Sequence, residues 1–177
     1  HMPAFLLEAE LHSGTAPARQ FLSELAALEW ALVEVIHAET PPPLDLGALQ
    51  ALPPEAWATA WFEPSAAVRL HRFSHPVNRY FQKCRVSDEA PPIPEPEAAA
   101  TVVYRHGLTV WRMDLTSAMA RVLEALLGRV PIGDALGRLG VDESDPAAIA
   151  EAERSVMVWF REWVSSGLFA ELRRPPA

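Results

Sequence analysis

The chain has 177 residues, half of them apolar, and its formal net charge at pH 7 is −8. This length allows one or two small domains with a real core, and the acidic balance argues against nonspecific binding to nucleic acid or anionic membranes. Cys84 is the single cysteine, which excludes an internal disulfide and the cysteine-rich zinc patterns. No apolar run approaches the ~18 residues that span a bilayer and no signal peptide is recognisable, so we expect a cytoplasmic protein without membrane contact.

The first predicted element is an amphipathic helix over residues 17–38, which ends before the prolines at 41–43. Its apolar residues recur at helical spacing and share one face: Phe21, Leu25, Leu28, Leu32 and Val35. Two shorter helical pieces are expected at 46–52 and 54–60. A half-buried strand is predicted at 67–73, because apolar and polar residues alternate there.

His75-Pro76 opens a further predicted helix that extends to Cys84. The segment 87–100 contains four prolines interspersed with acidic residues, which is typical of a stiff, solvated linker. A β-hairpin is then predicted from strands at 101–105 and 108–113, joined by a turn at His106-Gly107.

Three helices follow the hairpin. The first ends at Gly128, the second covers about 131–139, and the third begins at Asp145-Pro146 and ends at Gly167. A short edge strand then starts at Leu168.

This order of elements predicts an α+β protein with a small antiparallel sheet, in which the C-terminal part is a winged-helix-like domain. We expect a helical domain with one strand at 3–86, the linker at 87–100 and the winged-helix-like recognition domain at 101–174. The fold class alone does not name a function.

DNA binding is the default role of a winged helix, and the charge pattern argues against it. From residue 99 onward, nine arginines stand against ten carboxylates, whereas a DNA-binding domain is clearly basic. A winged-helix transcription regulator therefore remains the alternative hypothesis, and our main expectation is a protein that binds no nucleic acid.

A search for catalytic and metal-binding motifs is negative. The chain lacks a glycine-rich phosphate loop, the HExxH motif and a nucleophile elbow. His71 and His75 are four residues apart, a spacing that presents two metal ligands on one helical face. Pro76 and the strand pattern before it remove that meaning, so we predict no metal site and no catalytic residue in this chain.

One basic patch stands out in the acidic sequence, and aromatic residues lie between its members: Arg69, His71, Arg72, His75, Arg79, Lys83 and Arg85. These residues could simply balance the glutamates of the first helix. They could also form a docking surface for an acidic partner or a precursor peptide.

The chain resembles a bacterial family of partner proteins in peptide modification, whose best-known relatives are partner subunits of the methanobactin-biosynthesis oxidase. Some members carry the label "putative DNA-binding domain". The resemblance covers about residues 20–140 and rests on diffuse runs: Leu25–Ala31, Pro64–Ser65, Arg69–Phe73, His75–Phe81 and Val103–Val110. Separately, the stretch Asp114–Leu172 looks like the winged-helix precursor-recognition element of ribosomally made, modified peptides.

The resemblance implies a non-catalytic subunit that forms a heterodimer with a TIM-barrel oxygenase. The iron would belong to the oxygenase, so this chain would carry no cofactor of its own. The chain would bind the leader of a ribosomally made precursor peptide, whose cysteines the complex modifies with O2 in natural-product biosynthesis.

On this hypothesis a leader adds a strand to the hairpin edge and contacts the third helix. The predicted peptide-binding residues are Thr109, Val110, Trp111, Arg112, Met113, Arg154, Val158 and Arg161. The predicted oxygenase interface is Arg69, Arg72, His75, Asn78 and Arg79. Alternatives stay open for single residues, because Val110 and Val158 could be ordinary core and His75-Pro76 a simple turn and cap.

Overall fold

The computed structural model describes residues 16–39, 44, 47, 52–86, 89–141 and 144–175. The elements, in chain order, are α2 (Ala16–His37), α4 (Pro54–Trp57), β1 (Trp61–Pro64), β2 (Val68–Phe73), α5 (Val77–Val86), β3 (Ala99–His106), β4 (Thr109–Leu115), α6 (Ser117–Leu127), α7 (Ile132–Gly137), α8 (Pro146–Ser165) and β5 (Phe169–Arg173). The predicted α+β class is confirmed. Within the described part of the chain, no helix is long and apolar enough to cross a membrane. The predicted helix at 46–52 falls mostly outside the described residues.

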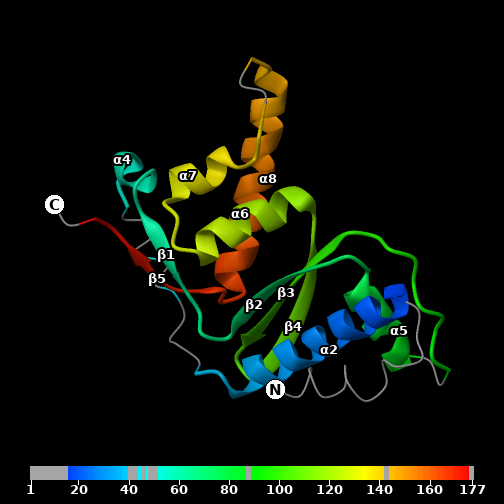
Figure 1. Ribbon diagram of the computed structural model, residues 1–177. Helices are drawn as coiled ribbons and strands as arrows, with labels where there is room; N and C mark the ends of the chain where they lie inside the picture. The colour runs from blue at the N-terminus through cyan, green and yellow to red at the C-terminus, as the bar shows by residue number, and fades with distance from the viewer. Residues whose placement is uncertain are drawn as a thin grey trace.

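A three-stranded antiparallel sheet in the order β2-β3-β4 forms the centre of the fold (Figure 1). Val102 of β3 pairs with Leu70 of β2 on one side and with Met113 of β4 on the other. The hairpin turns at Gly107 and Leu108, one residue later than predicted. Gly107 has a φ of 59°, a conformation that glycine adopts without steric cost and that a tight two-residue turn needs at its first position.

The two faces of this sheet pack against different helices. Val103 is buried with residues of α2 and α5, whereas Val102 is buried with residues of α6, α8 and β5. Successive residues of a strand point to opposite faces, so the hydrophobic run in β3 serves two cores at once. Figure 1 shows α2 and α5 on one side of the sheet and α6, α7 and α8 on the other.

A second, two-stranded sheet joins β1 to β5 in antiparallel register, with Phe62 opposite Leu172. The sequence led us to expect one strand before the linker, but the described structure has two there. Phe62 is fully buried and stacks on Phe169 with 4.3 Å between ring centroids. The strand β1 was missed because its four residues are too short to show alternation.

The proline-rich segment does not separate two independent cores. β2, which precedes it, pairs with β3, which follows it, and β1 pairs with β5. Buried residues from both sides of the segment, such as Phe62 and Leu123, belong to the same hydrophobic cluster. The predicted boundary at 87–100 therefore marks a change in composition, while the hydrophobic packing continues across it.

α6 ends just before Gly128 and α8 begins at Pro146, as predicted, whereas α7 ends two residues before the predicted limit of 139. The Thr116 side chain caps α6 by accepting from the Met119 amide at 3.2 Å, and Asp145 caps α8 by accepting from the Ala147 amide at 2.9 Å. Gly167 follows α8 with a φ of 75°. The last strand, β5, pairs with β1 and not with the hairpin, although the hairpin–three helices–strand order is the one we predicted.

Candidate functional site

The outer edge of β4 is a candidate site for strand addition. The Arg105 amide donates to the Ala67 carbonyl at 3.1 Å, so these two residues form a hydrogen-bonded pair. The register of β2 and β3 then makes the odd-numbered residues of β3 bond to β2. Bonded and unbonded pairs alternate along an antiparallel ladder, so β3 turns the backbone groups of its even-numbered residues toward β4. These groups bond to the odd-numbered residues of β4. Val110, Arg112 and Asp114 therefore direct their N–H and C=O groups outward.

On the α5 side of this edge, Arg112 is held over an aromatic ring. Its guanidinium lies 4.4 Å from the centroid of Phe81, and its Nη2 donates to the Gln82 side chain at 2.9 Å. Burial lowers the pKa of Arg112, and repulsion from Arg85 adds to this effect. Val110, on the same face of β4, is half-buried against the α2 cluster. The Val110 side chain thus belongs partly to the core, as one of the two open interpretations held.

On the opposite face of β4, apolar side chains extend from the core to the surface. Met113 packs against the α6 cluster, whereas Trp111 is 52% exposed and Thr109 is exposed. A half-exposed tryptophan beside free backbone groups is the kind of anchor that peptide grooves use, since aromatic side chains dominate binding energies. The five predicted β4 residues therefore line one edge, from both faces of the sheet.

The predicted residues of α8 lie on its solvent-facing side. Val158 is 63% exposed, so it is not a core residue, and neighbouring Met157 is 65% exposed. Arg154 bonds Glu151 on the same helix, and Arg161 is exposed. No hydrogen bond or ring contact between described residues joins this part of α8 to β4. Sequence periodicity did not single out Met157, which lies outside the apolar stripe of the helix.

The charged residues of the predicted oxygenase interface are paired within the chain. Arg69 bonds Glu34 of α2 at 2.9 Å, and Arg72 bonds Glu124 of α6 at 2.8 Å. The first pair supports the simpler interpretation that this patch balances the glutamates of the first helix. All four side chains are at least one-third exposed, so water screens both pairs and each contributes little stability.

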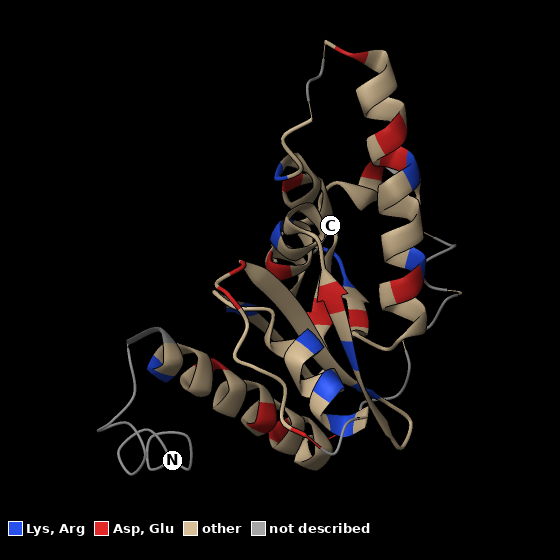
Figure 2. Cartoon of the chain, turned by 90° about the vertical axis from the view of Figure 1, so that its right-hand side faces the viewer, with Lys and Arg blue, Asp and Glu red and all other residues tan. Residues whose placement is uncertain are grey.

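The remaining polar members of the interface set lie around the start of α5. Asn78 donates to the Asp114 carboxylate at 2.9 Å, and Arg79 bonds Glu97 of the proline-rich segment. Arg79 remains 57% exposed in its side chain. Figure 2 shows basic positions gathered on α5, in a molecule whose other helices carry mostly acidic or uncharged residues on the visible face.

His75 is buried and cannot contact a partner directly. The residue is 1% exposed, its Nδ1 lies 3.0 Å from the Glu24 carboxylate, and the same carboxylate accepts from the Ser74 and His75 amides. Burial alone would raise the pKa of Glu24, but the hydrogen bonds from Ser74 and His75 lower it on balance. Of the two roles considered for His75-Pro76, the geometry favours the turn that ties α5 to α2.

The structure places His71 and His75 in different elements. His71 lies in strand β2 and His75 in the turn after it, so their spacing does not place both on one helical face. Burial lowers the pKa of His71, and its ring stacks on Phe73 with 5.6 Å between centroids. Among the described residues, no group of three or more His, Cys, Asp or Glu could hold a metal ion. Cys84 is exposed on α5.

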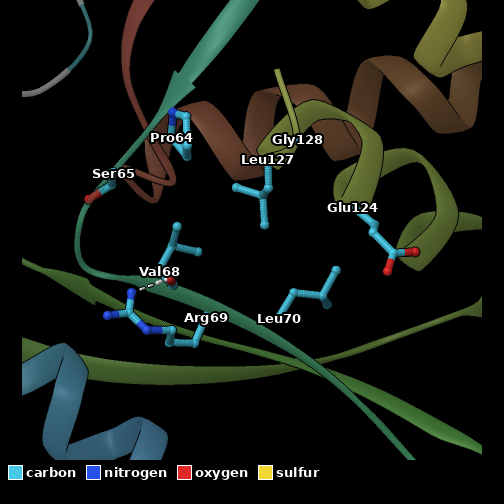
Figure 3. Close-up of a pocket in the computed structure, with 8 residues that line it drawn as sticks. All are labelled: Pro64, Ser65, Val68, Arg69, Leu70, Glu124, Leu127 and Gly128. Carbon is cyan, nitrogen blue, oxygen red and sulfur yellow. Dashed lines mark hydrogen bonds between the residues drawn. The ribbon is translucent and has the colours of Figure 1, made fainter. Parts of the chain in front are cut away.

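A cleft of about 420 Å³ lies beside the other outer strand of the sheet, β2 (Figure 3). Its walls come from the end of β1, from β2 and from the C-terminal end of α6. The lining residues are Pro64, Ser65, Val68, Arg69, Leu70, Glu124, Leu127 and Gly128. This cleft could not be predicted from local sequence patterns, because it forms between segments more than fifty positions apart.

No protein-family model matches this chain, and no curated protein is significantly similar to it. The resemblance described above therefore remains a prediction from the sequence.

Proposed function

We propose that this chain is the non-catalytic partner subunit of an iron-dependent TIM-barrel oxygenase. In this proposal it binds the leader of a ribosomally made precursor peptide and presents cysteines of the peptide for oxidative modification. The observation that best supports peptide binding is the outer edge of β4, where outward backbone groups of Val110 and Arg112 lie beside the half-exposed Trp111. An extended peptide can add to such an edge as a further strand.

The edge offers both generic and selective contacts. Main-chain hydrogen bonds to Val110 and Arg112 would provide affinity that is independent of the peptide sequence. Side chains on one face of the added strand would meet Trp111 and Met113, and those on the other face would meet Arg112. Alternation along the strand therefore makes the site selective for a peptide with apolar residues at every second position.

Iron and oxygen chemistry belong to the oxygenase in this proposal, and the chain contributes peptide capture and docking. We assign two exposed arginines to the oxygenase contact, Arg79 on the α5 side of the sheet and Arg72 of β2, which turns to Glu124 on the α6 side. Asn78 connects the start of α5 to β4 through its hydrogen bond to Asp114, and the buried His75 connects the turn before α5 to α2 through Glu24. Arg69 borders this contact at the edge of β2.

Co-expression with the oxygenase encoded by a neighbouring gene tests docking. We expect one heterodimer peak in size-exclusion chromatography, with iron only when the oxygenase is present. The double charge reversal of Arg72 and Arg79 to glutamate should dissociate this complex, whereas Arg154→Glu on α8 should leave it intact. A complex that forms equally well with the double variant would refute this docking surface.

Titration with the leader peptide tests strand addition. The Arg112 N–H points away from β3, so Arg112→Pro removes a group of the free edge without breaking the β3–β4 ladder. Arg112→Ala removes the same side chain and keeps the N–H, which makes it the matched control. We expect the proline variant to bind the leader about tenfold more weakly than the alanine variant, in line with the loss of one main-chain hydrogen bond plus a steric block.

The alternative hypothesis of a transcription regulator predicts a different result in these experiments. A chain that ignores the oxygenase and the leader, but shifts duplex DNA in a steeply salt-dependent manner, would replace the peptide-binding proposal with DNA binding.

A further inference from the structure

The cleft beside β2 is large enough to hold a side chain of a bound peptide. Leu127 of α6 points down toward Val68 and Leu70 of β2, and Pro64 and Ser65 close one end (Figure 3). The Arg72–Glu124 pair bridges β2 and α6 near the other end. The floor and roof are therefore apolar, and the two ends are polar.

The strand that borders this cleft also has a free edge. Ala67 bonds toward β3, so the alternation of the ladder turns the backbone groups of Val68, Leu70 and Arg72 outward. In the described part of the chain, no strand pairs with this side of β2. The Arg69 guanidinium folds over the edge instead and donates to the carbonyls of Val68 and Ala66, at 2.8 and 2.9 Å.

The charge of β2 decides what can add to it. Within six residues the strand carries Arg69, His71 and Arg72 and no carboxylate. A second copy of the chain, paired antiparallel about Leu70, would place Arg69 opposite His71 and Arg72 opposite Val68, so neither guanidinium would meet a carboxylate across the strand pair. An acidic strand meets the opposite situation, because its carboxylates can take the places that Glu34 and Glu124 now occupy.

We propose that the outer edge of β2 is a second strand-addition site, which binds an acidic, extended segment of a partner protein and places one of its apolar side chains in the cleft. The site lies on the opposite edge of the sheet from β4, so it does not depend on leader binding. It shares Arg69 and Arg72 with the surface assigned to the oxygenase, and the peptide titration below uses the chain alone, so its outcome is separate from that of oxygenase docking. Arg69 changes its hydrogen-bond partner on binding. Its guanidinium donates to the Val68 carbonyl in the free chain and to a carboxylate of the segment in the complex.

The exchange of partners needs little energy. The side chains of Arg69 and Glu34 are 36% and 37% exposed, and those of Arg72 and Glu124 are 45% and 55% exposed. Pairs this accessible to water contribute little, so a carboxylate from the segment replaces an internal one at almost no cost. The net gain then comes from main-chain hydrogen bonds to Leu70 and Arg72 and from the apolar side chain that enters the cleft.

The register defines the segment. The residues of the segment that lie opposite Leu70 and Val68 face the cleft and are apolar. The residue of the segment opposite Arg72 is acidic, and so is the one opposite Arg69, whose side chain lies on the α2 side of the sheet. A further glutamate opposite His71 keeps the probe acidic and soluble. Read antiparallel to β2, the best five-residue probe is Glu-Glu-Leu-Glu-Val, with its central leucine opposite Leu70.

The affinity of this capped pentapeptide for the full chain, measured by NMR titration, tests the proposal. Methylation of the backbone nitrogen of the central leucine removes a bond to β2 and should weaken binding at least about tenfold. Methylation of the glutamate that follows it affects an outward-facing N–H and should change the affinity less than about twofold. Equal effects of the two methylations, or no binding of the parent peptide, would overturn the proposal.

Two chain variants test the site from the protein side. Arg72→Gln should weaken the peptide two- to fivefold, and Glu124→Gln, which removes the internal competitor, should strengthen it by a similar factor. Arg138→Gln, at an exposed position just after α7 and outside every proposed site, is the matched control and should have no effect, and the peptide Lys-Lys-Leu-Lys-Val should not bind. A dimer in sedimentation that Leu70→Lys abolishes would assign the edge to a second copy of the chain and refute the acidic segment.

Discussion

Replacement of Glu24 by alanine removes the acceptor that ties α2 to the turn before α5. The carboxylate accepts from the Ser74 amide at 2.9 Å, from the His75 amide at 3.1 Å and from His75 Nδ1 at 3.0 Å. The Ser74 amide can turn to water, but the two His75 donors lie in a partly buried site and stay unsatisfied. Each such donor costs roughly 1–3 kcal/mol, so we expect Glu24→Ala to lower the free energy of unfolding by ~2–6 kcal/mol.

Urea unfolding at pH 7, followed by circular dichroism, measures this loss. Glu34→Ala is the matched control, because Glu34 lies on the same helix and pairs with Arg69 in water-accessible surroundings. We expect the control to lose at most ~1 kcal/mol. If the two alanine variants lose the same stability, the argument that Glu24 anchors α5 is wrong.

The same carboxylate gives a pH dependence. The pKa of Glu24 is lower in the folded chain than its ordinary value of 4.5. A depressed pKa means that the ionised carboxylate stabilises the fold fully above about pH 4.5, and that this stabilisation is lost as the pH falls through the folded value. The stability difference between the wild type and Glu24→Gln should therefore be constant from pH 7 to 5 and shrink below pH 4.5. A difference that grows on acidification would contradict this assignment.

Two further predictions compare matched substitutions. A Cβ at Gly133 would lie 3.0 Å from the Ala58 carbonyl oxygen, whereas a Cβ at Gly137 would meet open space, so Gly133→Ala should destabilise by ~1–2 kcal/mol and Gly137→Ala should be neutral or stabilising in thermal unfolding. Trp163 is fully buried and Trp111 is 52% exposed, so alanine should cost ~3–5 kcal/mol at Trp163 and under ~1 kcal/mol at Trp111. Leader affinity should nevertheless fall about tenfold with Trp111→Ala, and an unchanged affinity would remove Trp111 from the proposed site.

Local patterns were enough to predict most helices and the hairpin. The apolar stripe of the first helix predicted residues 17–38, and α2 covers Ala16–His37. Asp145-Pro146 predicted the start of α8, because a capping carboxylate and a proline at the first position both act within one helical turn. The hairpin was shifted by one residue only, since both His106 and Gly107 fit a tight turn by composition.

Long-range pairing could not be read in the same way. β1 pairs with β5 across more than a hundred positions, and nothing in Trp61–Pro64 indicates its partner. Composition did single out the basic patch, but each carboxylate that neutralises it comes from a distant element, as Glu124 does for Arg72. The burial of His75 likewise depends on α2, which the local sequence His75-Pro76 does not reveal. The β4 edge was predictable because a hairpin at the end of a sheet leaves one strand unpaired.

Hydrogen exchange of the β4 amides, with and without the leader peptide, tests the proposed function most directly. The amides of Val110 and Arg112 point outward and should exchange rapidly in the free chain, whereas those of Trp111 and Met113 bond to β3 and should already be protected. If the leader adds as a strand, protection of Val110 and Arg112 should rise at least about tenfold while Trp111 and Met113 change little. Saturating leader that leaves Val110 and Arg112 unprotected would contradict strand addition at β4.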